Sequence, residues 1–411
     1  MKVAVVAEFY PRRADPVLGV WAHRQALAAR DAGAEVQVLV LHRLVPSRSA
    51  LAGGPGQAAR SLGRLLGQRH HETRDGVRVT YVRYLSPSRS RHYHAWGAWA
   101  APALGLALRG LRRSFDFELI HAHNAVPAAD AVRRVGLDVP LAISIHGGDV
   151  LYVAPRSQAG RAAVETNLAA AETVLANSQG IAELARRYGA RETRVVHLGA
   201  DLPESRAGHA NAQDTPQARE GRQERAPTLV TVGHLVARKR HADVIKALAV
   251  LAKAHPTLRY EIVGEGPERA GLEALAGQLE VSERVDFRGQ LAHEQAIAAA
   301  RACTLFAMPS TEEAFGVAYI EAMAAGVPAI GCRGEPGPEE IAAAGDGFVL
   351  VPPGDIERLS QRIDELLSDR HRLREASMRA RETVAANFSW RACGEQTLAA
   401  YEHALKMGRR R

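Results

Sequence analysis

The chain has 411 residues, of which 46% are hydrophobic and 24% are charged, as is ordinary for a globular protein. This length predicts two or three domains. The three cysteines lie far apart without Cys-x-x-Cys spacing, which argues against a disulfide framework or a zinc site. No run of 18 apolar residues predicts a membrane-spanning helix, and the first residues are typical of a strand rather than a signal peptide. We therefore expect a cytoplasmic protein.

The formal net charge of +8 is unevenly distributed along the chain. Residues 40–113 contain 13 basic residues and two acidic ones. Arginines and leucines alternate at helical spacing over residues 60–69, which suits either an anionic membrane surface or a solvated helix face. The uncharged run 95–108 is interpreted as a buried helix or as a segment at the bilayer interface. No nucleic-acid-binding module is recognisable, so we expect no nucleic-acid partner.

Short apolar runs alternate with helical patterns along residues 1–202. Strands are expected at 2–7, 35–41, 77–83, 118–122, 140–145, 172–176 and 193–197. Helices are expected at 19–32, 94–113, 125–135, 157–170 and 178–188. This alternation predicts a mostly parallel sheet with helices on both faces.

Residues 203–227 interrupt the pattern, because they are rich in Gln, Arg, Glu, Ala and Gly, and are expected to form a flexible linker. A second alternating series follows. Its strands are expected near 228–233, 258–263, 284–288, 303–307, 327–331 and 347–350. Its helices are expected near 240–254, 267–279, 293–300, 317–325, 336–343 and 355–367, and residues 369–405 are also expected to be helical. The fold class is therefore α/β, with two doubly wound domains that bind ligands at strand carboxyl ends.

Two glutamates in the second half, Glu313 and Glu321, are separated by seven residues. Glu313 is expected in a loop after an apolar strand, and Glu321 about two turns into a helix that Gly316 opens. A helix N-terminus favours phosphate, and flanking carboxylates suit the hydroxyls of two sugars. This arrangement predicts a nucleotide-sugar pocket.

The stretch around Glu313 and Glu321 resembles the Glu-x7-Glu signature of family 4 retaining glycosyltransferases of the GT-B fold. The resemblance implies two Rossmann-like domains that face a central cleft. Residues 1–202 would form the acceptor-side domain and residues 228–387 the nucleotide-sugar-binding domain, and a C-terminal helix at 388–411 would return to the first domain. The implied reaction moves a hexosyl group from a nucleoside diphosphate sugar to a hydroxyl acceptor, without a metal ion. A lipid-linked sugar, a polysaccharide or a small molecule would be the acceptor.

The resemblance assigns donor-binding residues to the loop after the first strand of the second domain. The family has Gly-Arg-Leu here, followed by a lysine and a glycine. Gly233 and Lys239 match, whereas His234 replaces the arginine and Arg240 replaces the glycine. Lys239 would bind the donor diphosphate and lower the barrier to its departure, with Arg238 or Arg240 supplying the missing guanidinium.

Further donor contacts follow from the same resemblance. Glu313 would bind the donor sugar, Glu321 the ribose, and Arg288 the base or the ribose. The remaining donor-site residues would contribute mainly backbone groups: Gly264, Gly266, Phe315, Gly316 and Val317.

In the first domain, His146 and Asp149 belong to a segment that resembles the family motif Val-His-Gly-x-Asp. His146 would lie near the anomeric carbon and, with Glu313 and Lys239, is a predicted catalytic residue. Asp149 and His123 are predicted acceptor-binding residues, although a structural role for His123 is an equal alternative. Gly19 occupies the place of the second glycine of a family Gly-Gly, where the backbone would approach the diphosphate or the acceptor.

Two other functions stay open at this point. A nucleotide-sugar epimerase on the same fold would need no acceptor. A non-catalytic nucleotide-sugar-binding or partner-binding protein would tolerate the histidine at position 234.

Overall fold

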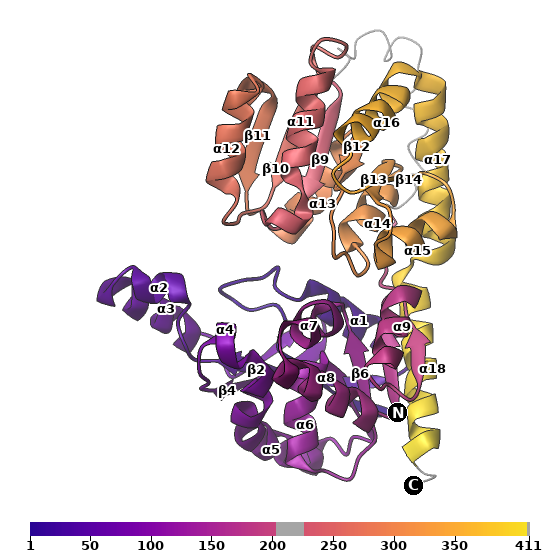
Figure 1. The fold of residues 1–411 in the computed structure, drawn as a ribbon. Coiled ribbons are helices and arrows are strands. Elements are labelled where there is room, and N and C mark those ends of the chain that lie inside the picture. The colour runs from indigo at the N-terminus through magenta and orange to yellow at the C-terminus, as the bar shows by residue number, and fades with distance from the viewer. Residues whose placement is uncertain (203–225, 409–411) are drawn as a thin grey trace. The chain divides into compact units, whose positions relative to one another are not determined.

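The computed structural model describes residues 1–202 and 226–408, which form two compact units (Figure 1). Unit 1 comprises Met1–Leu198 and Trp390–Arg411, and unit 2 comprises Gly199–Ser389. The predicted linker 203–227 falls outside the described residues apart from Ala226 and Pro227. Within the described ranges, no helix is both long and apolar enough to cross a bilayer.

In the described part of the chain, unit 1 is built on an eight-stranded sheet in which the edge strand β3 runs antiparallel to its neighbour and the other pairs are parallel. The central strand β1 pairs with β2 on one side and β5 on the other, and its residues are largely buried because helices cover both faces. In spatial order the strands are β3 (His71–Arg74), β4 (Val77–Tyr84), β2 (Glu35–Arg43), β1 (Lys2–Ala7), β5 (Leu119–His123), β6 (Leu141–Ile145), β7 (Thr173–Ala176) and β8 (Thr193–Val195).

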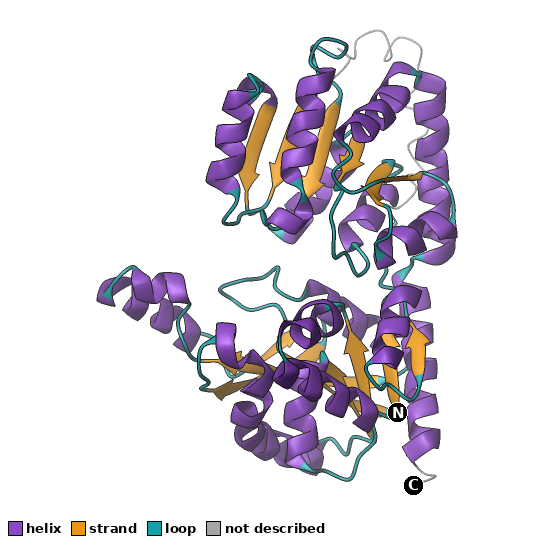
Figure 2. Cartoon of the chain, in the orientation of Figure 1, coloured by secondary structure: helices purple, strands orange, loops and turns teal. Residues whose placement is uncertain are grey.

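Helices pack against both faces of this sheet (Figure 2). Small side chains let helices α1 and α18 approach the sheet closely, and the ring of Tyr401 completes that core. The α-helices of unit 1 are α1 (Val20–Asp31), α2 (Arg48–Ala52), α3 (Pro55–Leu66), α4 (Arg89–His92), α5 (Trp96–Ser114), α6 (Asp130–Val135), α7 (Ala154–Arg156), α8 (Gln158–Ala170), α9 (Gln179–Arg187) and α18 (Trp390–Gly408).

Unit 2 contains a six-stranded sheet whose strands are all parallel. In spatial order they are β11 (Val285–Gly289), β10 (Arg259–Val263), β9 (Thr228–Val232), β12 (Leu305–Ala307), β13 (Ala329–Cys332) and β14 (Phe348–Val351). Its α-helices are α11 (His241–Leu251), α12 (Arg269–Gln278), α13 (His293–Ala302), α14 (Val317–Met323), α15 (Pro336–Ala344), α16 (Ile356–Ser368) and α17 (Arg370–Asn387). Aliphatic residues of α11, α12 and α16 form the core with the strands.

Each sheet has a central point at which the order of its strands reverses. In unit 2 the chain moves outward from β9 through β10 to β11, then returns to β12 on the other side of β9. In unit 1 the same reversal separates β1 from β5. Loops leaving adjacent strands at such a switch point diverge, and the crevice between them is where doubly wound sheets bind ligands.

The α/β fold class and the predicted strands are confirmed, with three differences. The polar edge strand β3 has no apolar alternation and was not expected. Helices α2 and α3 project from the sheet of unit 1, and none of the α3 side chains is buried (Figure 1). The predicted helix at 94–113 has one buried face that packs on α6, while Trp99 and Leu106 on its other face are exposed.

Helix α18 packs against α1 through a glycine, and this contact yields a prediction. A Cβ atom at Gly394 would lie 2.1 Å from the backbone oxygen of Ala28. We expect Gly394→Ala to destabilise the protein by about 1–2 kcal/mol, because the overlap outweighs the better helix propensity of alanine. Gly110 in α5 has no atom within 4 Å of the same position, so Gly110→Ala should stabilise by about 0.5–1 kcal/mol. Urea unfolding followed by circular dichroism measures both, and equal effects would contradict the packing argument.

Candidate functional site

The candidate donor site of unit 2 is formed by the loops that leave β9 and β12 at the switch point. The backbone N–H of Thr311 donates to the carbonyl of Arg238 at 2.8 Å, so the two loops are hydrogen-bonded to each other. The first loop carries His234, Arg238 and Lys239, and the second carries Glu313. The fold therefore brings together residues that lie about 75 positions apart in the chain.

Glu313 is the centre of this arrangement, with a side chain that is only 11% exposed. The Lys239 ammonium donates to its Oε2 at 2.5 Å, and the Ser310 hydroxyl donates to the same oxygen at 2.9 Å. The Arg238 guanidinium lies 3.9 Å away. Burial alone would raise the pKa of Glu313, but Lys239, Arg238 and Ser310 together lower it below its usual value. The carboxylate is therefore charged at neutral pH although it is buried.

Two residues that the sequence analysis did not assign hold this loop in place. The Glu335 carboxylate accepts a hydrogen bond of 2.8 Å from the backbone N–H of Glu313. The Tyr319 hydroxyl contacts the Met308 carbonyl and lies 3.0 Å from the Ser310 hydroxyl. Burial raises the pKa of Glu335, and the neighbouring charge of Glu313 raises it further. An acidic residue just after β13 was the sequence signal that could have identified Glu335.

The loop after β9 explains one departure from the family pattern. Arg240, which replaces the family's glycine, has a φ angle of 55°, in the left-handed region that glycine adopts most easily. Its guanidinium pairs with Asp243 of α11 at 2.5 Å. Of the two alternatives for the missing guanidinium, Arg238 is therefore the one that lies beside Glu313.

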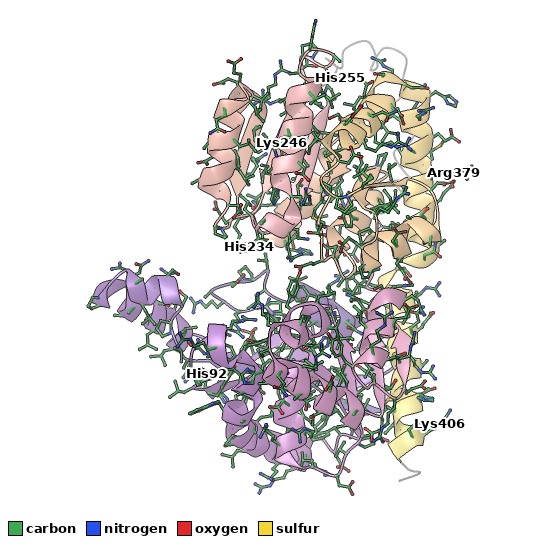
Figure 3. All side chains as sticks on the ribbon, viewed as in Figure 1. His92, His234, Lys246, His255, Arg379 and Lys406 are labelled. Atoms are coloured by element: carbon green, nitrogen blue, oxygen red, sulfur yellow. The ribbon has the colours of Figure 1, made fainter. Side chains whose placement is uncertain are left out.

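His234 is exposed at the end of β9. Figure 3 shows it at one end of unit 2, with His255 at the opposite end and Lys246 between them. The side chain is thus accessible at the edge where the candidate donor site lies. Among residues 1–202 and 226–408, no contact of its ring explains why a histidine stands here.

The glycine turn after β10 supports the β9 loop by close backbone contact. A Cβ atom at Gly264 would lie 1.9 Å from the Gly233 oxygen, and one at Gly266 would lie 2.3 Å from the Leu235 oxygen. The Leu235 N–H also donates to the Glu265 carbonyl at 3.0 Å. These glycines thus have a packing reason to be present, whether or not they also contact a nucleotide.

Gly316 precedes α14 with a φ angle of 89°, as expected for a residue that opens a helix. Phe315 is buried and contacts the ring of Phe388, while Val317 is the first residue of α14. Glu321 is the fifth residue of α14, so it lies little more than one turn into the helix rather than two. Its carboxylate is 3.7 Å from the His293 ring.

Arg288 is already paired within the sheet. Its guanidinium lies 3.0 Å from Glu261 and 3.6 Å from Asp286. A contact with a base or ribose would have to compete with these carboxylates, so the structure gives this predicted contact less support than the others.

In unit 1, His123 and His146 are brought together at the ends of β5 and β6. His123 Nδ1 and His146 Nε2 are 3.0 Å apart, and the two rings are nearly parallel. Within the described part of the chain, His123 Nε2 and His146 Nδ1 have no hydrogen-bond partner. Burial lowers the pKa of His146 to about 4, so its ring is neutral at pH 7 and can exchange hydrogen bonds without carrying charge.

Asp149 and Gly19 have clear structural roles. The Asp149 carboxylate accepts hydrogen bonds from the Asn124 amide and from the backbone N–H groups of Ala125 and Val126. Its burial raises its pKa to about 6. Gly19 has a φ angle of 66°, and a Cβ atom there would lie 2.2 Å from the Phe9 backbone. In the structure, the close backbone approach at Gly19 is made to the loop after β1.

Comparisons with known proteins agree with this architecture. A model described as "Glycosyltransferase Family 4" matches residues 18–204, and one described as "Glycosyl transferases group 1" matches residues 213–383. A D-inositol 3-phosphate glycosyltransferase from Catenulispora acidiphila is 31% identical over 73% of this chain and 76% of its own length. The chain belongs to glycosyltransferase family 4. This glycosyltransferase is also 27% identical to 2-deoxystreptamine glucosyltransferase from Streptomyces kanamyceticus, over 75% of this chain and 83% of that protein.

Solved structures show that this family 4 glycosyltransferase has the GT-B fold. Sucrose-phosphate synthase from Thermosynechococcus elongatus matches with a TM-score of 0.74 and 21% identity, over 98% of each chain. Anabaena HepE in complex with UDP-glucose matches with a TM-score of 0.68 and 20% identity, over 97% of this chain and 98% of that one.

The buried pair of Lys239 and Glu313 leads to a second prediction. Lys239→Met should destabilise unit 2 by roughly 2–4 kcal/mol at pH 7, because it leaves a buried carboxylate without its closest counterion. Adding Glu313→Gln should recover at least half of that loss. Urea unfolding of both variants measures the difference, and a double variant no more stable than Lys239→Met would contradict the pairing. The loss should shrink as the pH falls, because burial favours the protonated form of Glu313 once Lys239 is absent.

Proposed function

We propose that this glycosyltransferase moves a hexosyl group from a nucleoside diphosphate sugar to a hydroxyl acceptor, with retention of the anomeric configuration. The observation that carries the proposal is the charged, buried Glu313 carboxylate held beside Lys239 and Arg238 at the switch point of unit 2. Such a site offers an acceptor for sugar hydroxyls next to two cations for a diphosphate. The HepE complex, which contains UDP-glucose on the same fold, supports the assignment of donor class.

The donor-binding roles follow from this placement. Lys239 and Arg238 bind the diphosphate, and Glu313 accepts hydrogen bonds from the sugar. Glu321 binds the ribose hydroxyls. Because the leaving nucleoside diphosphate gains negative charge as the glycosidic bond breaks, fixed cations lower the barrier without a metal ion. Full activity in the presence of EDTA tests the absence of a metal requirement.

In the proposed reaction the bond between the anomeric carbon and the diphosphate oxygen breaks, and the acceptor oxygen bonds to the same face of that carbon. The acceptor proton passes to an oxygen of the leaving phosphate. His146 is neutral at pH 7, so its proposed role is to position the reacting hydroxyl by a hydrogen bond rather than to act as a cation. His123 holds the His146 ring through the 3.0 Å contact described above.

A thermal-shift panel with UDP, GDP, ADP, CDP and dTDP tests donor binding. A ligand at about 100 times its Kd stabilises by about 2.7 kcal/mol, so one diphosphate should raise the melting temperature of the wild type. Glu321→Ala should weaken this shift, because it removes the ribose contact. Glu375→Ala removes an exposed glutamate of α17 in the same unit and should leave it unchanged. A folded wild-type protein that no diphosphate stabilises would overturn the proposed donor class.

The chemistry is tested with the sugar nucleotide that corresponds to the stabilising diphosphate. Slow transfer to water should release the hexose first in the donor's anomeric form, as one-dimensional NMR can follow before mutarotation. Release of the opposite anomer would exclude retention. Conversion to a different sugar nucleotide would favour an epimerase, and binding without any turnover would favour a non-catalytic protein.

We also propose that unit 1 contacts an anionic membrane surface through α3. None of the residues of this helix is buried, and it carries the exposed Leu62 and Leu66 beside Arg60 and Arg64. Replacing Arg60, Arg64 and Arg69 by glutamate should abolish co-sedimentation with vesicles that contain phosphatidylserine. The matched control replaces the exposed Arg113, Arg187 and Arg191, which changes the net charge equally. If both variants lose vesicle binding equally, net charge alone accounts for the binding, and α3 is not a specific membrane surface.

A further inference from the structure

Unit 1 contains a cavity of about 1120 Å³ at the carboxyl edge of its sheet. Its walls include residues just after β1 and β5, so it opens at the switch point of this unit, and Asp149 forms part of it. Ligand pockets of small molecules have volumes of about 300–1000 Å³, so the cavity has room for a substrate. Apart from Gly19, the residues predicted to bind the donor lie in unit 2, so this cavity is a candidate for the second substrate.

The acidic groups of the cavity already have partners. Glu8 is buried, and its carboxylate accepts a hydrogen bond of 2.6 Å from the Tyr93 hydroxyl. Asp149 accepts three hydrogen bonds from neighbouring N–H groups, as described above. Both carboxylates are therefore already hydrogen-bonded to groups of the protein.

The basic groups outnumber these carboxylates, because four arginines line the same cavity. Arg12 and Arg43 are held by neutral oxygens: Arg12 donates to the carbonyls of Glu8 and Leu41, and Arg43 donates mainly to Ser86 and adjacent carbonyls. The Nε of Arg12 is buried, and among the described residues nothing accepts its hydrogen. These two guanidinium groups thus carry positive charge without a carboxylate in direct contact.

The other two arginines are more accessible. The side chain of Arg89 is 53% exposed, and its guanidinium packs over the rings of Tyr93 and Phe9 and lies 4.0 Å from Glu8. Arg156, at the end of α7, is exposed and forms no ion pair within the described ranges. An anion that enters the cavity could therefore bind these two side chains while displacing the fewest contacts within the protein.

One part of the wall is apolar. Val45, Leu51 and Leu65 line the cavity beside the arginines, and the last two belong to the projecting helices α2 and α3. Leu51 is 53% exposed, so the apolar surface continues from the cavity toward the outside of these helices. A ligand that matches this cavity combines an anionic group with an apolar portion.

We propose that the cavity binds the acceptor through an anionic group, such as a phosphate, held by Arg89 and Arg156, with an apolar portion of the acceptor against Val45, Leu51 and Leu65. This inference rests on the proposed transferase function, because it assigns the cavity to the acceptor. The same chemistry is offered by a phosphorylated lipid and by a soluble sugar phosphate. The experiment therefore includes one probe of each kind.

The test is isothermal titration calorimetry with octyl phosphate, kept below its micelle concentration, and with glucose 1-phosphate. Octyl β-D-glucoside is the neutral comparison. The stabilising nucleoside diphosphate is present in excess to fill the donor site. At least one phosphate should bind about tenfold more tightly than the glucoside, because charge-assisted hydrogen bonds to arginine are the stronger contacts. Tighter binding of octyl phosphate would assign a lipid-like acceptor, and tighter binding of glucose 1-phosphate a soluble one.

Variants identify the binding groups. The double variant Arg89→Gln and Arg156→Gln should weaken phosphate binding at least about tenfold. The matched double variant at Arg113 and Arg187, two exposed arginines of unit 1 outside the cavity, should bind as the wild type does. Glu8→Gln removes the acid nearest Arg89 and should therefore tighten phosphate binding, whereas the arginine variants weaken it. Circular dichroism checks that this variant is folded.

The inference is overturned if neither phosphate binds at about 10 mM, if the glucoside binds as well as both phosphates, or if the Arg89 and Arg156 variant binds unchanged. These results differ from failure of the proposed function. If a nucleoside diphosphate stabilises the protein but no phosphate probe binds, the proposed donor site stands and only the assignment of the cavity to an anionic acceptor fails. If the probes bind through these arginines but no nucleoside diphosphate binds, the anion-binding cavity stands and the proposed transferase function fails.

Discussion

The whole architecture depends on one constraint, which is that a parallel sheet buried on both faces must send its connections over helices. Each parallel strand therefore ends at the same edge, and near the middle of each sheet the chain crosses from one side of its first strand to the other. At the reversal, loops from adjacent strands part and leave a crevice. In unit 2 these loops carry Lys239 and Glu313, and in unit 1 they carry Glu8 and Asn124. The candidate chemistry is thus concentrated where the topology provides an opening.

Burying Glu313 is costly unless cations accompany it, and this links stability to function. Lys239 and Arg238 compensate the buried carboxylate when no substrate is bound, and the same two cations are the groups proposed for the diphosphate. A bound donor would replace the carboxylate as a partner of these cations, while its sugar hydroxyls would donate to Glu313. The site is therefore organised before the substrate arrives, which limits the reorganisation needed during transfer.

The two units differ in the way their charge is compensated. In unit 2 the basic side chains of the candidate site lie directly against a carboxylate. In the cavity of unit 1 the arginines lie mainly against carbonyl oxygens and aromatic rings, which orient the guanidinium groups without neutralising them. This difference underlies the proposal of a substrate with both hydroxyls and phosphates for the first site and of an anionic acceptor for the second. It also gives a local reason for part of the basic excess in residues 40–113.

The sequence by itself determined the fold class and nearly every strand, because alternating apolar runs and glycine-rich turns are local signals, whereas the candidate donor residues came from the resemblance to a family motif. Tertiary structure decided which of these residues meet. Only the folded chain brings Arg238 rather than Arg240 beside Glu313, pairs Arg288 with Glu261, and uses Glu335 to hold the Glu313 loop. The same is true of the cavity in unit 1, whose arginines come from separate loops and helices. Local pattern predicts elements, whereas the neighbours of a charged side chain depend on contacts between segments far apart in the chain.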